Sequence, residues 1–216
     1  MLDCRVRVAA RASSARAVTS SAARAVLSSA AAAVRRRCAS PRECREQTWE
    51  VLSAARENGL IKNLGVSNHL IYQIEELRAL EKAPVSVNQL QYHPWVPSWQ
   101  EDIAQHCREN GIQLMAYFSL GGAQNAGSVG VMETIAAIGK KHGASSHQVM
   151  LRWAVQTGLT VIPGTGNPAH MRQNINAYSF NLSAEDMAAI TQLGQNKEMA
   201  SKFMFIGGPS SDGPQL

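Results

Sequence analysis

The fold is decided by the stretch Gly59-Leu-Ile-Lys-Asn-Leu-Gly-Val-Ser-Asn68, where a short apolar strand follows a glycine and ends in polar residues. The residues before it, 48–59, carry apolar side chains at helical spacing and end at a glycine, as helices commonly do. Residues 71–81 show helical spacing again. A helix, a strand and a further helix in this order predict one repeat of a parallel α/β sheet.

The same alternation continues along the chain as far as residue 193. We predict three more strands, over residues 85–91, 112–117 and 159–163. Further helices are predicted over residues 99–110, 131–142, 146–157, 168–177 and 183–193, with a glycine-rich loop at 121–130. Polar residues stand at the carboxyl ends of the strands, which is where parallel α/β barrels place their chemistry. The sequence therefore predicts an α/β domain with a site at that edge.

Positive charge is concentrated at the start of the chain. The 216 residues carry a formal charge of +5, but residues 1–40 hold eight arginines and one acid, which leaves −2 for the remainder. This distribution removes the main support for nucleic-acid binding by the whole chain. The Ala-, Arg- and Ser-rich composition predicts a disordered basic leader over residues 1–46. An organellar transit peptide, a biased translation without a role and a basic nucleic-acid arm are alternative interpretations of this leader.

Several protein classes lack support in the sequence. No uncharged apolar run approaches the roughly 20 residues that span a bilayer. The four cysteines, Cys4, Cys38, Cys44 and Cys107, do not have the distribution of a disulfide scaffold or of a zinc site. We therefore expect no metal and a reduced, cytoplasmic compartment, with organellar targeting by the leader as the alternative.

Several of these stretches together resemble the aldo-keto reductases, a family of NAD(P)H-dependent oxidoreductases built on a TIM (β/α)8 barrel. The matching stretches are Gly59–Asn68, Val87-Asn-Gln-Leu-Gln-Tyr-His-Pro94, Gly111-Ile-Gln-Leu-Met-Ala-Tyr117, Gln148-Val-Met-Leu-Arg-Trp153, Val161-Ile-Pro163 and 174–187. Their order and spacing fit the second half of that fold. The resemblance implies an incomplete barrel, strands five to eight with their helices, over residues 47–195, followed by a C-terminal tail at 196–216.

The resemblance also implies an activity, the reduction of aldehydes or ketones to alcohols, with small carbonyl compounds as substrates. The family's catalytic Tyr, Lys, Asp and His belong to the first half of its barrel, and no residue of this chain matches them. His93 belongs to a different motif, so no catalytic residue is assigned. We expect the chain to keep the cofactor-binding half and to be inactive by itself.

The resemblance assigns the cofactor contacts to strand ends and to the turn after the last strand. The hydroxyl and amide groups of Ser67, Asn68 and Gln89 would bind the nicotinamide carboxamide, which has one acceptor and two donors to satisfy. Tyr117 would stack on the nicotinamide ring, with a core tyrosine as the structural alternative. Asn88 and Ser67 could equally be strand-end caps. The full set of expected contacts is Ser67, Asn68, Gln89, Tyr117, Phe118, Leu120, Thr165, Gly166, Asn167, His170, Gln173 and Asn174.

The turn expected to bind the cofactor phosphate departs from the family's pattern in two places. Family members selective for NADP commonly place Lys and Arg where this chain has Gly164 and His170. These two residues offer less attraction for a 2′-phosphate, so NADP or NAD is expected as cofactor, without a strong preference for NADP. An ordinary turn with a helix N-cap is the structural alternative for this segment.

Two alternatives to an active oxidoreductase stay open. One is a non-catalytic nicotinamide-nucleotide-binding or regulatory subunit, and the other is a truncated gene product. The exposed sheet edges of a half barrel also predict self-association.

Overall fold

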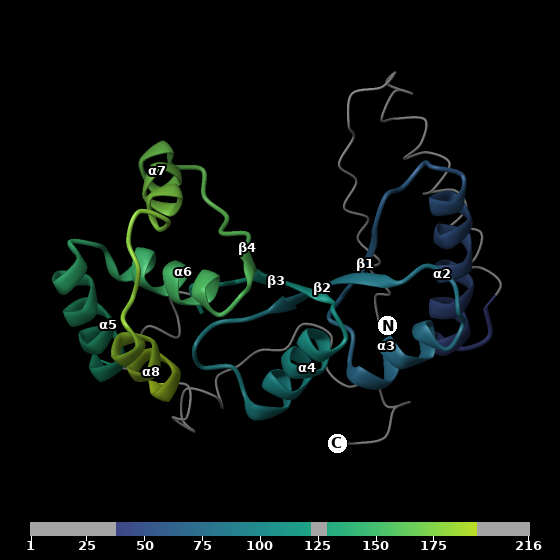
Figure 1. Cartoon of the computed structure of the whole chain (residues 1–216), viewed down its shortest axis with the longest axis horizontal. Coiled ribbons are helices and arrows are strands. Elements are labelled where there is room, and N and C mark those ends of the chain that lie inside the picture. The colour runs from purple at the N-terminus through teal and green to yellow at the C-terminus, as the bar shows by residue number, and fades with distance from the viewer. Residues whose placement is uncertain (1–37, 122–128, 194–216) are drawn as a thin grey trace. The chain divides into compact units, whose positions relative to one another are not determined.

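The computed structural model of the chain describes residues 38–121 and 129–193 (Figure 1). The predicted leader up to residue 37, most of the predicted glycine-rich loop and the tail from residue 194 lie outside the described residues. Among the described residues, no helix combines the length and the apolar character that crossing a bilayer requires.

Helices and strands alternate as the sequence predicts. The strands are β1 (Leu64–Ser67), β2 (Val85–Gln91), β3 (Gln113–Tyr117) and β4 (Thr160–Val161). The helices are α2 (Pro41–Glu57), α3 (Ile71–Arg78), α4 (Ser98–Glu109), α5 (Val129–His142), α6 (Ser146–Gln156), α7 (Pro168–Asn176) and α8 (Ala184–Leu193). Every predicted element is present, and most boundaries differ from the prediction by one to three residues.

The first described helix, α2, begins earlier than the apolar periodicity predicts. It starts at Pro41 rather than residue 48, so residues 41–46 are its first turns, although their composition groups them with the basic leader. Ser40 is the N-cap, and its hydroxyl oxygen accepts a hydrogen bond from the backbone N–H of Glu43 at 3.2 Å. A serine followed by proline is a helix-start signal, because proline suits the first helical position. Ser40 and Pro41 precede the first apolar residues of the helix, and they determine where α2 begins.

The strands form one sheet in the order β1-β2-β3-β4, which is also their order along the chain. β3 and β4 are parallel, with Met115 opposite Thr160 and Ala116 opposite Val161. Parallel neighbours joined through helices define an α/β fold, as predicted. The chain divides within β2 into two compact units, residues up to Asn88 and residues from Gln89, which we describe separately.

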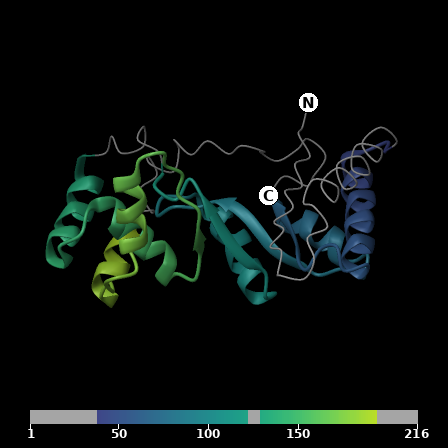
Figure 2. The same ribbon diagram turned by 90° about the horizontal axis from the view of Figure 1, so that it is seen from above.

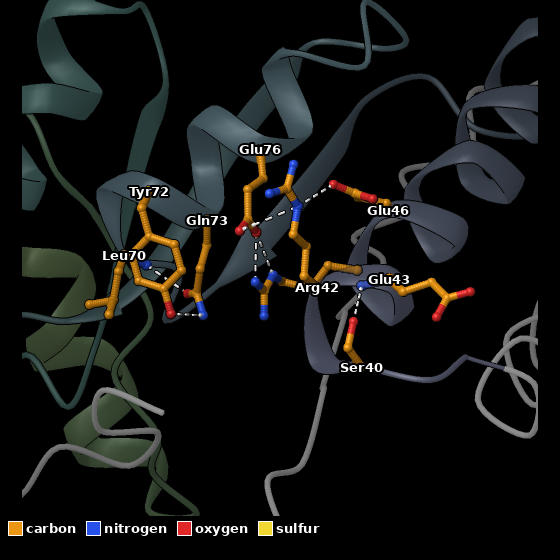
Figure 3. Close-up of polar contacts among 9 residues, drawn as sticks. Ser40, Arg42, Glu43, Glu46, Leu70, Tyr72, Gln73 and Glu76 are labelled. Atoms are coloured by element: carbon orange, nitrogen blue, oxygen red, sulfur yellow. Dashed lines mark hydrogen bonds and ion pairs between the residues drawn. The ribbon is translucent and has the colours of Figure 1, made fainter. Parts of the chain in front are cut away.

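In the first unit, α2 packs against α3 and β1. The buried core includes Trp49, whose indole N–H donates to the Ala83 carbonyl at 3.0 Å. Arg45 of α2 is buried and forms an ion pair of 2.6 Å with Glu76 of α3. Figure 3 shows Arg42 of the same helix on the other oxygen of Glu76, at 3.7 Å. Apolar packing and these ion pairs together hold the two helices.

In the second unit, α4 packs against β3, and α5 packs against α6 and α8 (Figures 1 and 2). The start of α8 is fixed to the end of α5 by Asp186, a buried carboxylate. It accepts hydrogen bonds from His142 and Lys141, both at 2.9 Å. These bonds lower the pKa of Asp186 to about 2, so the carboxylate is charged at neutral pH.

Candidate cofactor-binding site

Buried and half-buried side chains alternate along β1 and along β3. On β1, Leu64 and Val66 are buried, whereas Ser67 is half-buried. On β3, Leu114 and Ala116 are buried, and Met115 and Tyr117 are half-buried. Since successive side chains of a strand point to opposite faces, each strand has one covered face and one open face. Ser67 and Tyr117, two of the predicted cofactor contacts, lie on the open face of their own strand, at its carboxyl end.

The turn after β1 is fixed by a side chain from β2. Asn68 has a positive φ of 56°, a conformation that asparagine tolerates better than most residues. The buried Asn88 then binds the backbone of the next residue in both directions. Its amide donates to the His69 carbonyl at 3.0 Å, and its side-chain oxygen accepts the His69 N–H at 3.4 Å. Asn88 therefore positions Ser67 and Asn68, in keeping with the strand-end cap that is one of its two interpretations from the sequence.

His69, whose backbone Asn88 binds, is buried and has a neutral side chain. Burial lowers the pKa of the imidazole to about 4, although the Ser67 carbonyl lies 3.2 Å from Nδ1 and partly opposes the shift. The positive charge of Arg45 lowers the pKa further. His69 is thus uncharged at neutral pH, and it adds no positive charge beside Ser67 and Asn68.

In the second unit, Gln89 and Met115 meet across neighbouring strands. The Gln89 amide donates to the Met115 sulfur at 3.2 Å. Met115 and Tyr117 share the open face of β3, because they are two residues apart. The structure therefore places Gln89 on the same face as Tyr117, with a soft, weakly accepting sulfur beside them. An amide and an aromatic ring on one open face are what the predicted nicotinamide contacts require.

A backbone hydrogen bond joins the end of β3 to the segment that follows β2. The Tyr117 carbonyl accepts the Tyr92 N–H at 3.2 Å. After it, Phe118 has a positive φ of 55° and its side chain is 47% exposed, while Leu120 is half-buried. Gly121 also has a positive φ, and a Cβ there would overlap the indole of the buried Trp95. This close approach determines how the chain leaves β3 toward Phe118 and Leu120.

Tyr92 and His93, which follow β2 directly, are both uncharged at neutral pH. Tyr92 donates its hydroxyl to Glu101, and its pKa is raised by burial and by that bond. His93 is fully buried, and burial lowers its pKa to about 3.

The turn after β4 is organised by its own side chains. The Thr165 hydroxyl accepts the Asn167 N–H at 3.1 Å, and the Asn167 side chain accepts the Ala169 N–H at 2.9 Å. Asn167 is thus the N-cap of α7, with Pro168 in the first position. Gly166 is exposed, and a Cβ there would meet no atom within 4 Å. The start of this helix offers its dipole to an anion, as in the predicted phosphate-binding turn.

The predicted adenosine contacts lie on α7, a helix without buried residues. His170 and Gln173 are exposed and Asn174 is half-buried. The Gln173 carbonyl accepts a hydrogen bond from the Gln148 side chain of α6 at 3.1 Å. The structure therefore brings 165–174 together in one turn and helix, and leaves their side chains accessible.

In the part of the chain that the structure describes, no three His, Cys, Asp or Glu residues are arranged to hold a metal ion. The residues described above offer amides, hydroxyls and aromatic rings, which suit an organic ligand better than a metal.

A parallel α/β sheet with polar and aromatic residues at the carboxyl ends of its strands is typical of α/β-barrel proteins that bind their ligands at that edge. A model of the Aldo/keto reductase family matches residues 28–195. This chain belongs to the aldo-keto reductase family.

Individual relatives and solved structures agree with this assignment. Aldose reductase B of Dictyostelium discoideum is 32% identical over 166 residues, which are 77% of this chain and 52% of that protein. The (1S)-1,7-diacetoxy-luvungin A aldo-keto reductase of Citrus sinensis is 35% identical over 169 residues, covering 76% of this chain and 52% of its own length. The chain spans about half the length of the curated relatives it matches.

Among solved structures, the aldo-keto reductase MGS-M4 from a deep-sea metagenome superposes with a TM-score of 0.69 at 28% identity, over 78% of this chain and 60% of that one. The thermostable aldo-keto reductase Tm1743, solved with the inhibitor epalrestat, gives 0.64 at 30% identity over 69% and 55% of the two chains. The four parallel strands and their helices are therefore part of a (β/α)8 barrel, as the sequence predicts.

Proposed function

We propose that this chain is the nicotinamide-nucleotide-binding part of an aldo-keto reductase, acting with NAD(P)H on small aldehydes or ketones. The observation that carries the proposal is the open face in the second unit, where Gln89 and Tyr117 lie on neighbouring strands at their carboxyl ends. Two relatives are described by names that include NADP(+) or NAD(P)H, a glycerol 2-dehydrogenase of Hypocrea jecorina and a probable D-xylose reductase of Arthroderma otae. Both names support a nicotinamide cofactor.

The chemistry of the available groups fits the nicotinamide end of this cofactor. A bound nicotinamide nucleotide supplies or accepts hydride, and the protein must hold it in one orientation. The Gln89 amide has both donors and an acceptor for the carboxamide, and the Tyr117 ring offers a flat surface for stacking. Ser67 and Asn68 of the first unit are proposed as further carboxamide contacts. These residues bind and orient, and none of them is proposed to transfer a proton.

The phosphate and adenosine ends are assigned to the turn after β4 and to α7. Backbone N–H groups at the start of α7 suit a phosphate, with Thr165, Gly166 and Asn167 around them. Gly164 and the exposed His170 stand where NADP-selective members place basic residues, so we propose no strong preference for NADP over NAD. Installing the basic pair, Gly164→Lys with His170→Arg, is expected to tighten NADPH binding about tenfold or more and to leave NADH binding unchanged.

Binding can be tested by titrating the full chain with NADPH and NADH while following quenching of tryptophan fluorescence. Loss of the stacking ring in Tyr117→Leu is expected to weaken both cofactors by about tenfold. The control is Tyr178→Leu, since Tyr178 is 61% exposed and lies outside the proposed contacts. Unchanged affinity in Tyr117→Leu, with a folded variant by circular dichroism, would contradict the proposed site.

Turnover is a separate question from binding. The family's proton-donating tyrosine and its Lys, Asp and His partners match no residue of this chain, so we propose that it binds the cofactor without turnover by itself. General acid–base catalysis typically contributes 10²–10⁴-fold in rate. Oxidation of NADPH by the purified chain with a nitrobenzaldehyde measures this directly. Robust turnover would show that catalytic residues are present and were not assigned.

We also propose that the chain associates with itself, in keeping with the alternative of a non-catalytic binding subunit. In the described part of the sheet, β4 pairs with β3 on one side only, and such an edge favours pairing with another strand. Nearby, Met171 and Ile175 of α7 are 46% and 70% exposed. Light scattering after size exclusion is expected to show a dimer that dissociates on dilution. A compact monomer at all concentrations would contradict self-association and leave cofactor binding unaffected.

A further inference from the structure

The cysteines at the start of α2 are paired, which the sequence analysis does not predict. Cys38 and Cys44 form a disulfide, with their Cα atoms 5.2 Å apart. This separation lies within the range that disulfides normally span. Cys38 precedes the N-cap Ser40 by two residues, and Cys44 lies in the first turns of the helix. The bond therefore closes a short loop around the beginning of α2.

Both sulfur-bearing residues are accessible to a reagent in solution. Cys38 and Cys44 are half-buried, whereas Cys107 is completely buried. Thiol–disulfide exchange needs access to the sulfur and a fraction of the thiolate form. The sequence neighbours Arg42 and Arg45 and the N-terminal end of the helix all favour a negative charge near Cys44. Cys44 is thus better suited than Cys107 to react.

The start of α2 does not depend on the disulfide for its hydrogen bonds. Ser40 caps the helix, and Glu43 returns a bond by accepting the Ala39 N–H at 2.6 Å. Figure 3 shows the Ser40 hydroxyl at the backbone nitrogen of Glu43. Further along, Arg45 remains paired with Glu76 of α3. Because these contacts hold the turn by themselves, the bond between the two sulfurs can break without release of the helix.

We propose that Cys38 and Cys44 are a reversible thiol modification site, which small-molecule disulfides oxidise and small-molecule thiols reduce. The Cys44 thiolate attacks one sulfur of the small disulfide, forming a mixed disulfide and releasing one small thiol. The Cys38 thiolate then attacks the Cys44 sulfur and releases the second small thiol. Two electrons pass from the protein to the oxidant, and the two protons lost by the cysteines are taken up by the released thiols.

The consequence of oxidation lies at the N-terminal turn of α2. Residues 39–41, inside the closed loop, line one side of a cleft whose other side includes Tyr72 and Glu76 of α3. The disulfide restricts the motion of this side of the cleft. Reduction removes this covalent restriction on residues 38–40, so the hydrogen bond from the Glu43 N–H to Ser40 opens more often. Exchange of the Glu43 amide with solvent is therefore expected to accelerate about tenfold or more, while the rest of α2 stays protected.

The experiment uses the full chain equilibrated at neutral pH with mixtures of reduced and oxidised glutathione, alkylated at that pH without denaturant and then digested with trypsin. The four cysteines fall on four tryptic peptides, and the peptides 38–42 and 43–45 stay joined only while the disulfide is present. The joined peptide is expected to appear as the oxidised fraction rises and to disappear when it falls, while Cys107 stays protected from alkylation until the protein is unfolded. Cys38→Ser and Cys44→Ser each abolish the joined peptide, and Cys4→Ser leaves it unchanged.

Three results would overturn the proposal. Complete alkylation of both cysteines at every glutathione ratio would show that no disulfide forms in solution. A disulfide involving Cys4 would show that the partner is different. A joined peptide that resists reduction until denaturant is added would show a permanent structural bond. Because the central measurement uses the unaltered chain, a variant that fails to fold does not affect the outcome.

Discussion

Two strand-to-helix turns of this molecule are built in different ways. The turn after β1 is fixed by Asn88, a residue nineteen positions away from the His69 backbone that it binds. The turn after β4 is fixed by Thr165 and Asn167, which bond to backbone groups two residues away. A turn held by a buried long-range contact keeps its geometry as long as the unit is folded. A turn held by local caps in a helix without buried residues can adjust when a ligand binds.

We assign the two turns to opposite ends of the proposed cofactor. Ser67 and Asn68, assigned to the reactive nicotinamide end, lie on the rigid turn of the first unit. Residues 165–174, assigned to the phosphate and adenosine end, lie on the locally capped turn of the second unit. Precise placement matters at the end where hydride is transferred, and less at the end that only contributes binding. Substitutions in the first turn are therefore expected to change global stability, and those in the second to act locally.

The largest effect on stability is expected from removal of the Asn88 side chain, which binds the backbone of the turn after β1. Asn88→Ala leaves the buried N–H and C=O of His69 without their partner, and an unsatisfied buried group costs about 1–3 kcal/mol. We expect the free energy of unfolding to fall by about 4 kcal/mol, measured by urea denaturation. A loss below about 1 kcal/mol would show that the turn does not depend on Asn88 and would remove the contrast.

Acid pH is expected to act on the same turn. The pKa of His69 is lowered from 6.5 to about 4 in the folded state, so the unfolded state binds more protons between these values. The contribution of neutral His69 to stability is complete above pH 6.5 and falls by roughly 3 kcal/mol as the pH approaches 4. Urea denaturation at several pH values measures this slope.

The variant His69→Gln is expected to flatten that dependence on pH, since it removes the group that titrates. His170→Gln, on the second turn, is the matched control because His170 is exposed. An equal flattening in both variants would mean that the acid sensitivity does not arise from the buried turn after β1.

A pair of glycines offers a direct comparison of the two regions. A Cβ at Gly65 of β1 would lie 2.9 Å from both the Cβ and the carbonyl oxygen of Val87, whereas one at Gly164 would meet nothing within 4 Å. Gly65→Ala is therefore expected to lower the free energy of unfolding by about 2 kcal/mol, and Gly164→Ala to change it by less than about 0.5 kcal/mol. Thermal unfolding of the two variants side by side decides this, and equal shifts would count against the difference in packing.

The smallest effect is expected at the cap of α7. Asn167→Ala removes the acceptor for the Ala169 N–H, and losing such a cap costs about 1 kcal/mol. Because α7 has no buried residues, the loss is expected as faster hydrogen exchange within α7, with little change in the global unfolding transition. A global destabilisation as large as that of Asn88→Ala would show that this turn is also part of the core.

Local sequence patterns predict the secondary structure correctly where the contacts that determine it are between near neighbours in the chain. The apolar spacing and terminal glycines predict the strands and helices, with β2 found at the predicted residues 85–91. The start of α2 differs because Ser40 and Pro41 lie before the apolar face, within a segment whose composition resembles the basic leader. The cysteine pair differs for a similar reason: a spacing of six residues says little about distance until Ser40 and Pro41 start a helix between them.

The sequence by itself determined the alternation of strands and helices, the family, and which residue types stand at the strand ends, because periodicity, glycine stops and motifs are properties of neighbouring residues. The tertiary structure decided what holds those residues in place. The binding of His69 by Asn88 and the approach of Trp95 to Gly121 depend on distances between segments that are far apart in the sequence. Such distances arise only when the chain packs, since packing brings together residues that no local pattern connects.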